Sequence, residues 1–183
     1  LAFIGLVRGD RVRIETLSQG PHERGPVLRG RRSVWRMLEQ MEAIQPVNTV
    51  SLAEGVKNFC VRNPASGIVL LISDLMDKQG YQSALRYFAA RQVDCYVIQV
   101  LSQEELEPDV QGDLKLVDCE DGDEAEITVS APLLARYQQT LADFTGGAQQ
   151  FCSRRGMHYV LANNQTPVED LVARYLRRRG LVR

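Results

Sequence analysis

The chain has 183 residues, of which 44% are hydrophobic and 25% are charged. This composition is typical of a globular protein and excludes a disordered chain, a collagen-like repeat or a coiled coil as a description of the whole. The length suits one core, so we expect a single domain over residues 1–183. No apolar run approaches the ~18 residues that a membrane-spanning helix needs.

The four cysteines are Cys60, Cys95, Cys119 and Cys152. They form no C-x-x-C pair and the chain has only 2 histidines, so neither a disulfide framework nor a zinc site is indicated. We therefore expect reduced thiols in a cytoplasmic protein, with Cys60 and Cys95 filling the core.

The net charge of -1 conceals a strong asymmetry. Between Glu104 and Glu126 the sequence has eleven acidic residues and one lysine, whereas arginines gather from Arg8 to Arg36 and near the carboxyl end. A dipolar surface of this kind suits pairing with a protein partner or with a second copy. Solvated faces explain such charge runs equally well, and a basic stripe without interleaved aromatic residues is a weak indication of nucleic-acid binding.

The amino-terminal region predicts short elements. Apolar residues 1–7 indicate the last turns of a helix, and the lack of a preceding cap or an initial methionine predicts that the chain is a fragment. Alternation over residues 11–17 predicts a strand with one wet face. A turn over residues 18–25 and a short strand over residues 26–29 are expected next.

Two capped helices are predicted after these strands. The first begins at Ser33 and ends before Pro46, with apolar residues at helical spacing. The second begins at Ser51 and ends at Asn63.

The most informative stretch is GIVLLISDL, residues 67–75. Its five consecutive aliphatic residues predict a strand that is buried on both faces in the middle of a parallel sheet. A helix that begins at Gly80 and a strand over residues 94–101 complete a right-handed parallel crossover unit. The inward face of that helix is expected to consist of Tyr81, Leu85 and Phe88.

The acidic segment interrupts this alternation of strand and helix. Residues 114–118 and 126–129 alternate around Asp121-Gly122, a hairpin turn signal, which predicts an edge hairpin kept soluble by its charges. Ser130 is the predicted cap of a helix that runs to about Arg155, with Gly146-Gly147 as a weak point. A strand over residues 158–161 and a helix over residues 167–179 complete one open, doubly wound α/β domain.

Ligands of such sheets bind beyond the carboxyl ends of the strands. The strand at residues 67–75 ends with Ile72-Ser73-Asp74 and is followed by Asp77. We expect the hydroxyls of Thr49 and Ser51, in a loop that ends at a helix start, to reach the same crevice. Oxygen ligands of this kind suit a divalent cation. Structural roles explain the same residues, since Asp74 can cap a turn and Ser51 can cap a helix.

Familiar catalytic signatures are absent from the sequence, including the phosphate-binding loop, the dinucleotide fingerprint, the nucleophile elbow and H-E-x-x-H. His22 lies in a Gly/Pro turn and His158 begins a strand, so neither has an obvious catalytic partner. We therefore expect a protein that is not an enzyme.

An ordered series of motifs resembles a known family. The series is Gly9-Asp10-Arg11-Val12, Arg29-Gly30-Arg31-Arg32, Ser51-Leu52-Ala53-Glu54-Gly55-Val56, Val69-Leu70-Leu71-Ile72-Ser73-Asp74 and Gln99-Val100-Leu101, with further matches towards the carboxyl end. Together these motifs resemble the carboxyl-terminal von Willebrand factor A-like domain of the bacterial DUF58 family, whose members are typically encoded beside MoxR-type AAA+ ATPases. The resemblance implies a Rossmann-like, doubly wound, mostly parallel sheet with a metal-ion-dependent adhesion site.

Such a site takes an Asp-x-Ser-x-Ser loop after the first strand, a threonine from a second loop and an aspartate after the fourth strand. Asp74 matches the aspartate, while Val50 stands where the threonine is expected, between Thr49 and Ser51. The Asp-x-Ser-x-Ser loop has no match, so the resemblance implies that the first central strand is missing as well. The strands at residues 11–17 and 67–75 would then lack the neighbour between them, and the fragment would self-associate.

The resemblance implies a non-enzymatic protein-interaction module that binds Mg²⁺ or Mn²⁺ through Asp74, Thr49 and Ser51. It would work with a MoxR-type AAA+ ATPase in protein assembly, maturation or stress response, with membrane contact only through upstream segments. Three alternatives stay open. They are a metal-independent scaffold that uses its acidic hairpin and arginine-rich ends, a magnesium-dependent hydrolase that uses Asp74 and Asp77, and a nucleic-acid binder, although we expect no nucleic acid.

Overall fold

The computed structural model describes residues 1–17, 25–45, 50–91, 93–118 and 122–172. The chain divides into two compact units, Leu1–Pro64 and Ala65–Arg183. That residues 1–183 form one domain stays a prediction. Within the described ranges, no helix combines the length and the apolar character needed to cross a membrane.

The first unit begins with helix α1 (Ala2–Arg8), as the sequence predicted. Gly9 ends this helix with a φ of 82°, a left-handed conformation that only glycine adopts without steric cost. Strand β1 (Arg11–Val12) then pairs antiparallel with β2 (Leu28–Arg29). The predicted strand over residues 11–17 is therefore too long, because β2 offers only these two residues for pairing.

Helices α2 (Val34–Glu42) and α3 (Leu52–Arg62) complete the first unit. Ser51 caps α3 as predicted, since its Oγ accepts the Glu54 N–H at 3.2 Å. Ser33 precedes α2 but gives no side-chain cap, because its hydroxyl donates to the Arg29 carbonyl oxygen and the 3-10 turn η1 (Arg31–Ser33) leads into the helix. A small core joins α1, β2 and α2, and its buried members are Leu6, Leu28 and Met37.

The second unit contains a three-stranded parallel sheet in the order β3-β4-β7. Its strands are β3 (Gly67–Ser73), β4 (Val93–Leu101) and β7 (His158–Asn163). The central strand is β4, so the placement of residues 67–75 in the middle of the sheet is wrong for the described part of the chain. Within the described residues, β3 pairs only with β4. The prediction that β3 is buried on both faces is wrong too, because its Ile72 side chain is 65% exposed.

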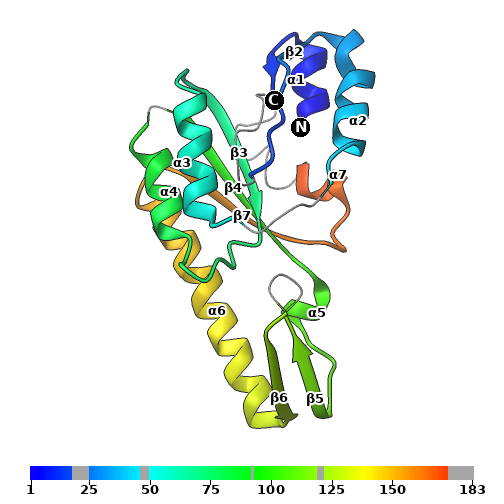
Figure 1. Ribbon diagram of the computed structural model, residues 1–183, viewed down its shortest axis with the longest axis vertical. Helices are drawn as coiled ribbons and strands as arrows, with labels where there is room; N and C mark the ends of the chain where they lie inside the picture. Colours follow the sequence, from blue (N-terminus) through cyan, green and yellow to red (C-terminus); the bar gives the residue numbers. More distant parts are fainter. Residues whose placement is uncertain (18–24, 46–49, 92, 119–121, 173–183) are drawn as a thin grey trace. The chain divides into compact units, whose positions relative to one another are not determined.

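Helices α4 (Gln82–Ala89) and α6 (Ala131–Ser153) connect the strands of this sheet. Tyr81, Leu85 and Phe88 are buried, as the sequence predicted for α4. The Tyr81 ring meets the rings of Phe144 and Phe151 edge-on, at centroid distances of 5.5 and 5.9 Å, so α4 and α6 lie side by side (Figure 1). Helix α6 continues without a break through Gly146 and Gly147.

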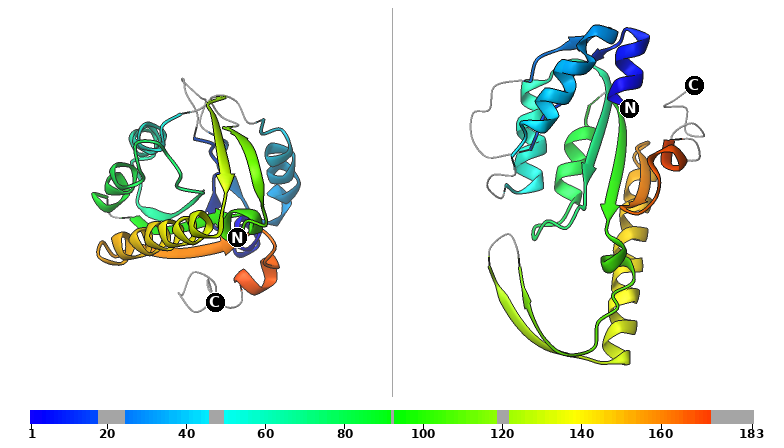
Figure 2. Two further views of the ribbon diagram at one scale, coloured as in Figure 1. Left: turned by 90° about the horizontal axis from the view of Figure 1, so that it is seen from below. Right: turned by 90° about the vertical axis from the view of Figure 1, so that its right-hand side faces the viewer.

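The acidic segment forms the predicted hairpin, between β4 and α6. After the short helix α5 (Gln103–Leu106), which the sequence did not predict, β5 (Gly112–Val117) pairs antiparallel with β6 (Glu124–Val129) as a curved ribbon outside the parallel sheet (Figure 2). The Asp118 N–H donates to the Asp123 carbonyl oxygen at 2.8 Å, so the pairing extends to the residues on either side of the segment that carries the predicted turn. Helix α7 (Val168–Asp170) follows β7.

The described residues thus form a mixed α/β structure with one parallel sheet and two antiparallel strand pairs. Cys60 and Cys95 are buried, as expected for core residues, and so is Cys152; none of these three thiols forms a disulfide. Cys119, His22, Thr49 and most of the predicted helix over residues 167–179 lie outside the described residues.

Candidate functional site

Asp74 follows β3 directly, at the carboxyl end of the parallel sheet, and its side chain is exposed. Its Oδ1 accepts the Met76 N–H at 2.9 Å, and the Ser73 hydroxyl oxygen accepts the Leu75 N–H at 3.0 Å. Asp and Ser side chains commonly make such local bonds to the backbone two residues on. The two bonds hold the Asp74 carboxylate at the end of the strand.

Leu75 gives this turn an unusual backbone. Its φ of 64° lies in the left-handed region, which costs a non-glycine residue roughly 1–2 kcal/mol. The Leu75 side chain is fully buried, and this burial offsets the strain. The direction in which the chain leaves β3 is therefore set by core packing.

Gln99 on the neighbouring strand β4 binds the backbone of the same turn. It is fully buried, its Nε2 donates to the Asp74 carbonyl oxygen at 2.8 Å, and its Oε1 accepts the Tyr159 hydroxyl proton at 2.6 Å. Burial raises the pKa of Tyr159 above its usual value, with further contributions from Cys152 and Tyr81, so the hydroxyl keeps its proton well into the alkaline range. A chain of hydrogen bonds thus runs from β7 through β4 to the backbone of Asp74.

The oxygen atoms near Asp74 fit a hard cation only in part. Ser73, Asp74 and Asp77 lie in one loop, although Asp77 Oδ1 already accepts the Gln79 N–H at 2.6 Å. In the part of the chain that the structure describes, no three His, Cys, Asp or Glu side chains gather into a metal site. Mg²⁺ is nevertheless often held by one or two carboxylates while it keeps several waters, so these donors suit it.

The other predicted ligands are not shown to join Asp74. Thr49 lies outside the described residues, and Ser51 belongs to the first unit, where its Oγ caps α3. His158, for which the sequence indicates no catalytic partner, stacks on the Tyr96 ring at a centroid distance of 4.4 Å.

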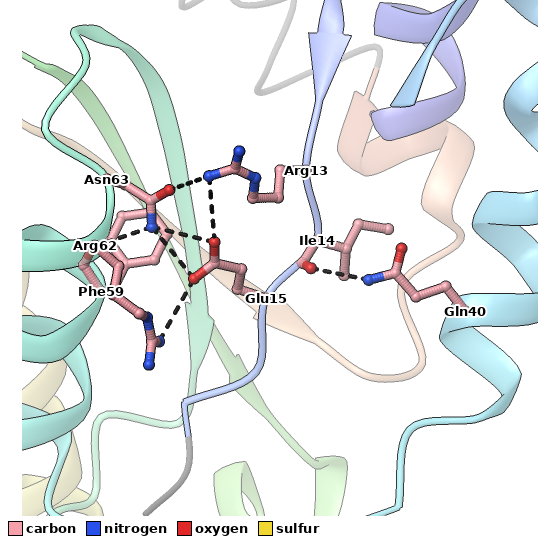
Figure 3. Close-up of polar contacts among 7 residues, drawn as sticks. All are labelled: Arg13, Ile14, Glu15, Gln40, Phe59, Arg62 and Asn63. Carbon is pink, nitrogen blue, oxygen red and sulfur yellow. Dashed lines mark hydrogen bonds and ion pairs between the residues drawn. The ribbon is translucent and has the colours of Figure 1, made fainter. Parts of the chain in front are cut away.

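A second polar cluster lies within the first unit and surrounds the Glu15 side chain (Figure 3). This carboxylate is 6% exposed and accepts the Asn63 Nδ2–H at 3.1 and 3.2 Å, while Arg13 and Arg62 lie at 3.6 and 3.5 Å. Arg13 also donates to Asn63 Oδ1. The cluster ties the segment after β1 to the end of α3.

On the other side of this segment, Gln40 of α2 donates to the Ile14 carbonyl oxygen at 3.1 Å (Figure 3). The side chains of Arg13 and Glu15 bind the end of α3, and the Ile14 carbonyl oxygen binds α2. Residues 13–15 are therefore held by two helices and not by a neighbouring strand. This arrangement explains why residues with a strand-like pattern are ordered without extending β1, and we assign the Glu15 cluster a structural role.

A cavity of about 300 Å³ opens in the second unit, where α5, β7 and α7 meet. Its lining includes Leu106, Asn163, Thr166 and Asp170 and does not include Asp74. The Asp74 carboxylate is exposed at the end of β3 and is not part of this cavity.

The family model described as "Protein of unknown function DUF58" matches residues 1–145. The chain belongs to the DUF58 family. A search of curated proteins found no match. The chain is also similar to a solved structure, the conserved hypothetical protein BatB from Bacteroides thetaiotaomicron, with a TM-score of 0.42 and 14% identity over 86% of this chain and 73% of that one.

In this DUF58 chain, Asp74 and Gln99 lie within the matched residues, whereas Tyr159 lies beyond them. The sequence pointed to Asp74 because it ends an aliphatic strand, but the supporting roles of Gln99 and Tyr159 were not predicted from it. One signal was present, because a glutamine within an apolar strand is rarely buried without a hydrogen-bond partner.

Proposed function

We propose that this DUF58 chain is a non-enzymatic protein-interaction module that contacts its partner at Asp74. The observation that supports it is an exposed carboxylate on a turn whose backbone is fixed by buried groups. Binding residues held on rigid elements keep their geometry when a partner arrives. The von Willebrand factor A-like, Rossmann-like arrangement and a MoxR-type AAA+ ATPase as partner belong to this proposal and rest on the motif resemblance.

The contact is proposed to depend on Mg²⁺ or Mn²⁺. Asp74 would hold the ion together with waters, and the ion would offer an open position to an acidic residue of the partner. That Thr49 and Ser51 complete the ligand set stays a prediction from the motif resemblance.

Calorimetric titration of MnCl₂ into the chain tests the ion site directly. We expect saturable binding that is lost in Asp74→Ala and kept in Asp94→Asn, a control at the opposite, amino end of the sheet. The Asp74 substitution is expected to leave the fold intact, because Gln99 bonds to the backbone of residue 74 and not to its side chain. Absence of Mn²⁺ binding, or equal binding by Asp74→Ala, would contradict the metal-dependent form.

Co-sedimentation with a purified MoxR-type ATPase tests the partner. Binding in Mg²⁺ that disappears with EDTA and with Asp74→Ala would support the adhesion-type contact. Binding that survives both treatments would favour the alternative of a metal-independent scaffold, for which the amphipathic β5–β6 hairpin is the supporting observation. A cytoplasmic location is part of the proposal and agrees with the reduced state of Cys60, Cys95 and Cys152, which form no disulfide.

A further inference from the structure

Helix α2 presents large apolar side chains to solvent. Trp35 is 75% exposed and is the chain's single tryptophan, and Leu38 and Met41 follow it at three-residue intervals, also exposed. We call these three residues the Trp35 face. The opposite side of α2 is in the core through Met37, so the Trp35 face is not needed for packing within the first unit. Exposed tryptophan with aliphatic neighbours is characteristic of binding hot spots.

The β5–β6 hairpin has a second apolar surface. In its register Leu114 faces Ile127 and Leu116 faces Ala125, which places all four side chains on one face of the ribbon, here called the Leu116 face. The other face carries the Lys115–Glu124 ion pair and the Asp113–Thr128 hydrogen bond. A two-stranded hairpin is marginally stable in water unless something covers its apolar side.

The charges beside the two faces are opposite. Exposed Arg31 and Arg32 stand at the start of α2. Asp118 and Asp123 continue the Leu116 face beyond its last apolar pair, because their backbones bond to each other in the same ladder. Asp123 contacts Lys78 Nζ at 3.2 Å, an exposed pair of the weak kind that an arginine can replace.

We propose that the Leu116 face of one copy docks on the Trp35 face of a second copy, with Arg31 and Arg32 opposite Asp118 and Asp123. Each copy offers both faces, so two copies can make the contact reciprocally and close as a two-fold dimer. The contact covers an exposed tryptophan and the apolar side of an isolated hairpin in one step. It does not involve Asp74.

An anionic membrane is the other surface that arginine and tryptophan suit. Helix α2 is a poor membrane ligand, because Glu39 and Glu42 lie exposed in its second half and would meet the lipid phosphates. An anionic membrane also offers no positive charge to the acidic hairpin, whereas a second copy does.

The full chain allows a direct test, since Trp35 is the only source of tryptophan fluorescence. We expect its emission to shift to shorter wavelength as concentration rises from about 1 μM to about 1 mM, in step with a doubling of mass by sedimentation equilibrium. Leu116→Lys should weaken dimerisation at least about tenfold, whereas Val117→Lys should leave it unchanged. These neighbours are matched, because they are 49% and 58% exposed and lie on opposite faces of the hairpin.

Charge reversal tests whether the two arginines lie opposite the two aspartates. Arg31→Glu/Arg32→Glu and Asp118→Arg/Asp123→Arg should each reduce dimerisation, and an equimolar mixture of the two variants should restore it. Far-ultraviolet circular dichroism of every variant should match the parent chain, which separates lost docking from lost folding.

A chain that stays monomeric throughout this range would overturn the proposal. So would a dimer that Leu116→Lys and Val117→Lys affect equally, because its contact would then be elsewhere. A blue-shifted emission independent of concentration would show a contact within one chain, and a shift seen only with phosphatidylglycerol vesicles would assign the Trp35 face to a membrane. Either result would also show that a second copy does not cover the Trp35 face.

Discussion

Gln99 donates its side-chain N–H to the backbone carbonyl oxygen of Asp74 at 2.8 Å from a fully buried position. The bond engages the main chain of Asp74 and leaves its carboxylate exposed. The group that fixes the turn is thus separate from the group that the turn presents, so each can be tested by its own substitution.

Replacement of Gln99 by Leu should lower the free energy of unfolding by about 1–3 kcal/mol. The Asp74 carbonyl and the Tyr159 hydroxyl would both lose their partner, and a buried polar group left unsatisfied costs about this much. Urea unfolding measures the change. Gln150→Leu, on the exposed side of α6, is the control and should shift stability by no more than about 0.5 kcal/mol. Equal effects of the two substitutions would show that the Gln99 bonds contribute nothing specific.

Glu15→Ala should destabilise the chain by about 1–3 kcal/mol, because Asn63 loses an acceptor and the guanidinium groups of Arg13 and Arg62 lose their shared carboxylate. Both arginines are partly exposed, so water replaces some of the lost interaction. Guanidinium unfolding followed by circular dichroism gives the value. Glu54→Ala, which removes an exposed carboxylate from α3, is the control for the loss of charge. If Glu54→Ala lowered the free energy of unfolding as much as Glu15→Ala, the structural role of the Glu15 cluster would be refuted.

The two adjacent glycines of α6 should respond differently to alanine. Gly146→Ala should raise stability by about 0.5–1 kcal/mol, because a Cβ there meets nothing within 4 Å and alanine favours the helix. Gly147→Ala should gain less or lose stability, because its Cβ would lie 3.2 Å from the Tyr81 hydroxyl oxygen. Thermal unfolding of the two variants side by side measures the difference, and equal gains would show that α4 does not approach α6 this closely.

Stability should fall as pH rises from about 9 towards about 11. Burial raises the pKa of the Cys152 thiol from 9.0 to about 11, so in this interval the unfolded chain loses the thiol proton while the folded chain keeps it. The contribution is fully present below the unfolded pKa and disappears as pH approaches the folded one. Cys152→Ala should show a shallower slope of urea midpoint against pH in this interval and the same slope below pH 8. Parallel slopes up to pH 11 would contradict the shift.

Much of the fold could be predicted from local patterns. Helix α3 followed from its serine cap and apolar spacing, α4 from its inward Tyr81, Leu85 and Phe88, and the hairpin from alternation around a turn signal. The length of β1 could not be predicted from local patterns, because it depends on which distant residues pair with it. The aliphatic run alone placed β3 in the middle of the sheet, and its lack of a neighbour was implied only by the motif resemblance, through the missing first strand. Alternation shows that a segment can form a strand, but it does not say how long its partner is.

The same distinction applies to the candidate site. Asp74 was identifiable because it follows an aliphatic run, which is a local feature. Its support from Gln99 and Tyr159 depends on the register of three parallel strands. Gln99 is 25 positions from Asp74 along the chain, and Tyr159 is 60 positions from Gln99. No spacing rule within one segment encodes such a register.

Strand β4 has a further consequence for the dynamics of the second unit. Residues 96–99 pair with β3 on one side and with β7 on the other, so their amide protons can exchange with solvent only when the sheet itself opens. Gln99 belongs to this stretch, and its side chain bonds to the Asp74 carbonyl oxygen. The main chain at Asp74 is therefore bonded to a strand that exchanges only when the sheet opens, while the exposed carboxylate can change its rotamer without breaking that bond.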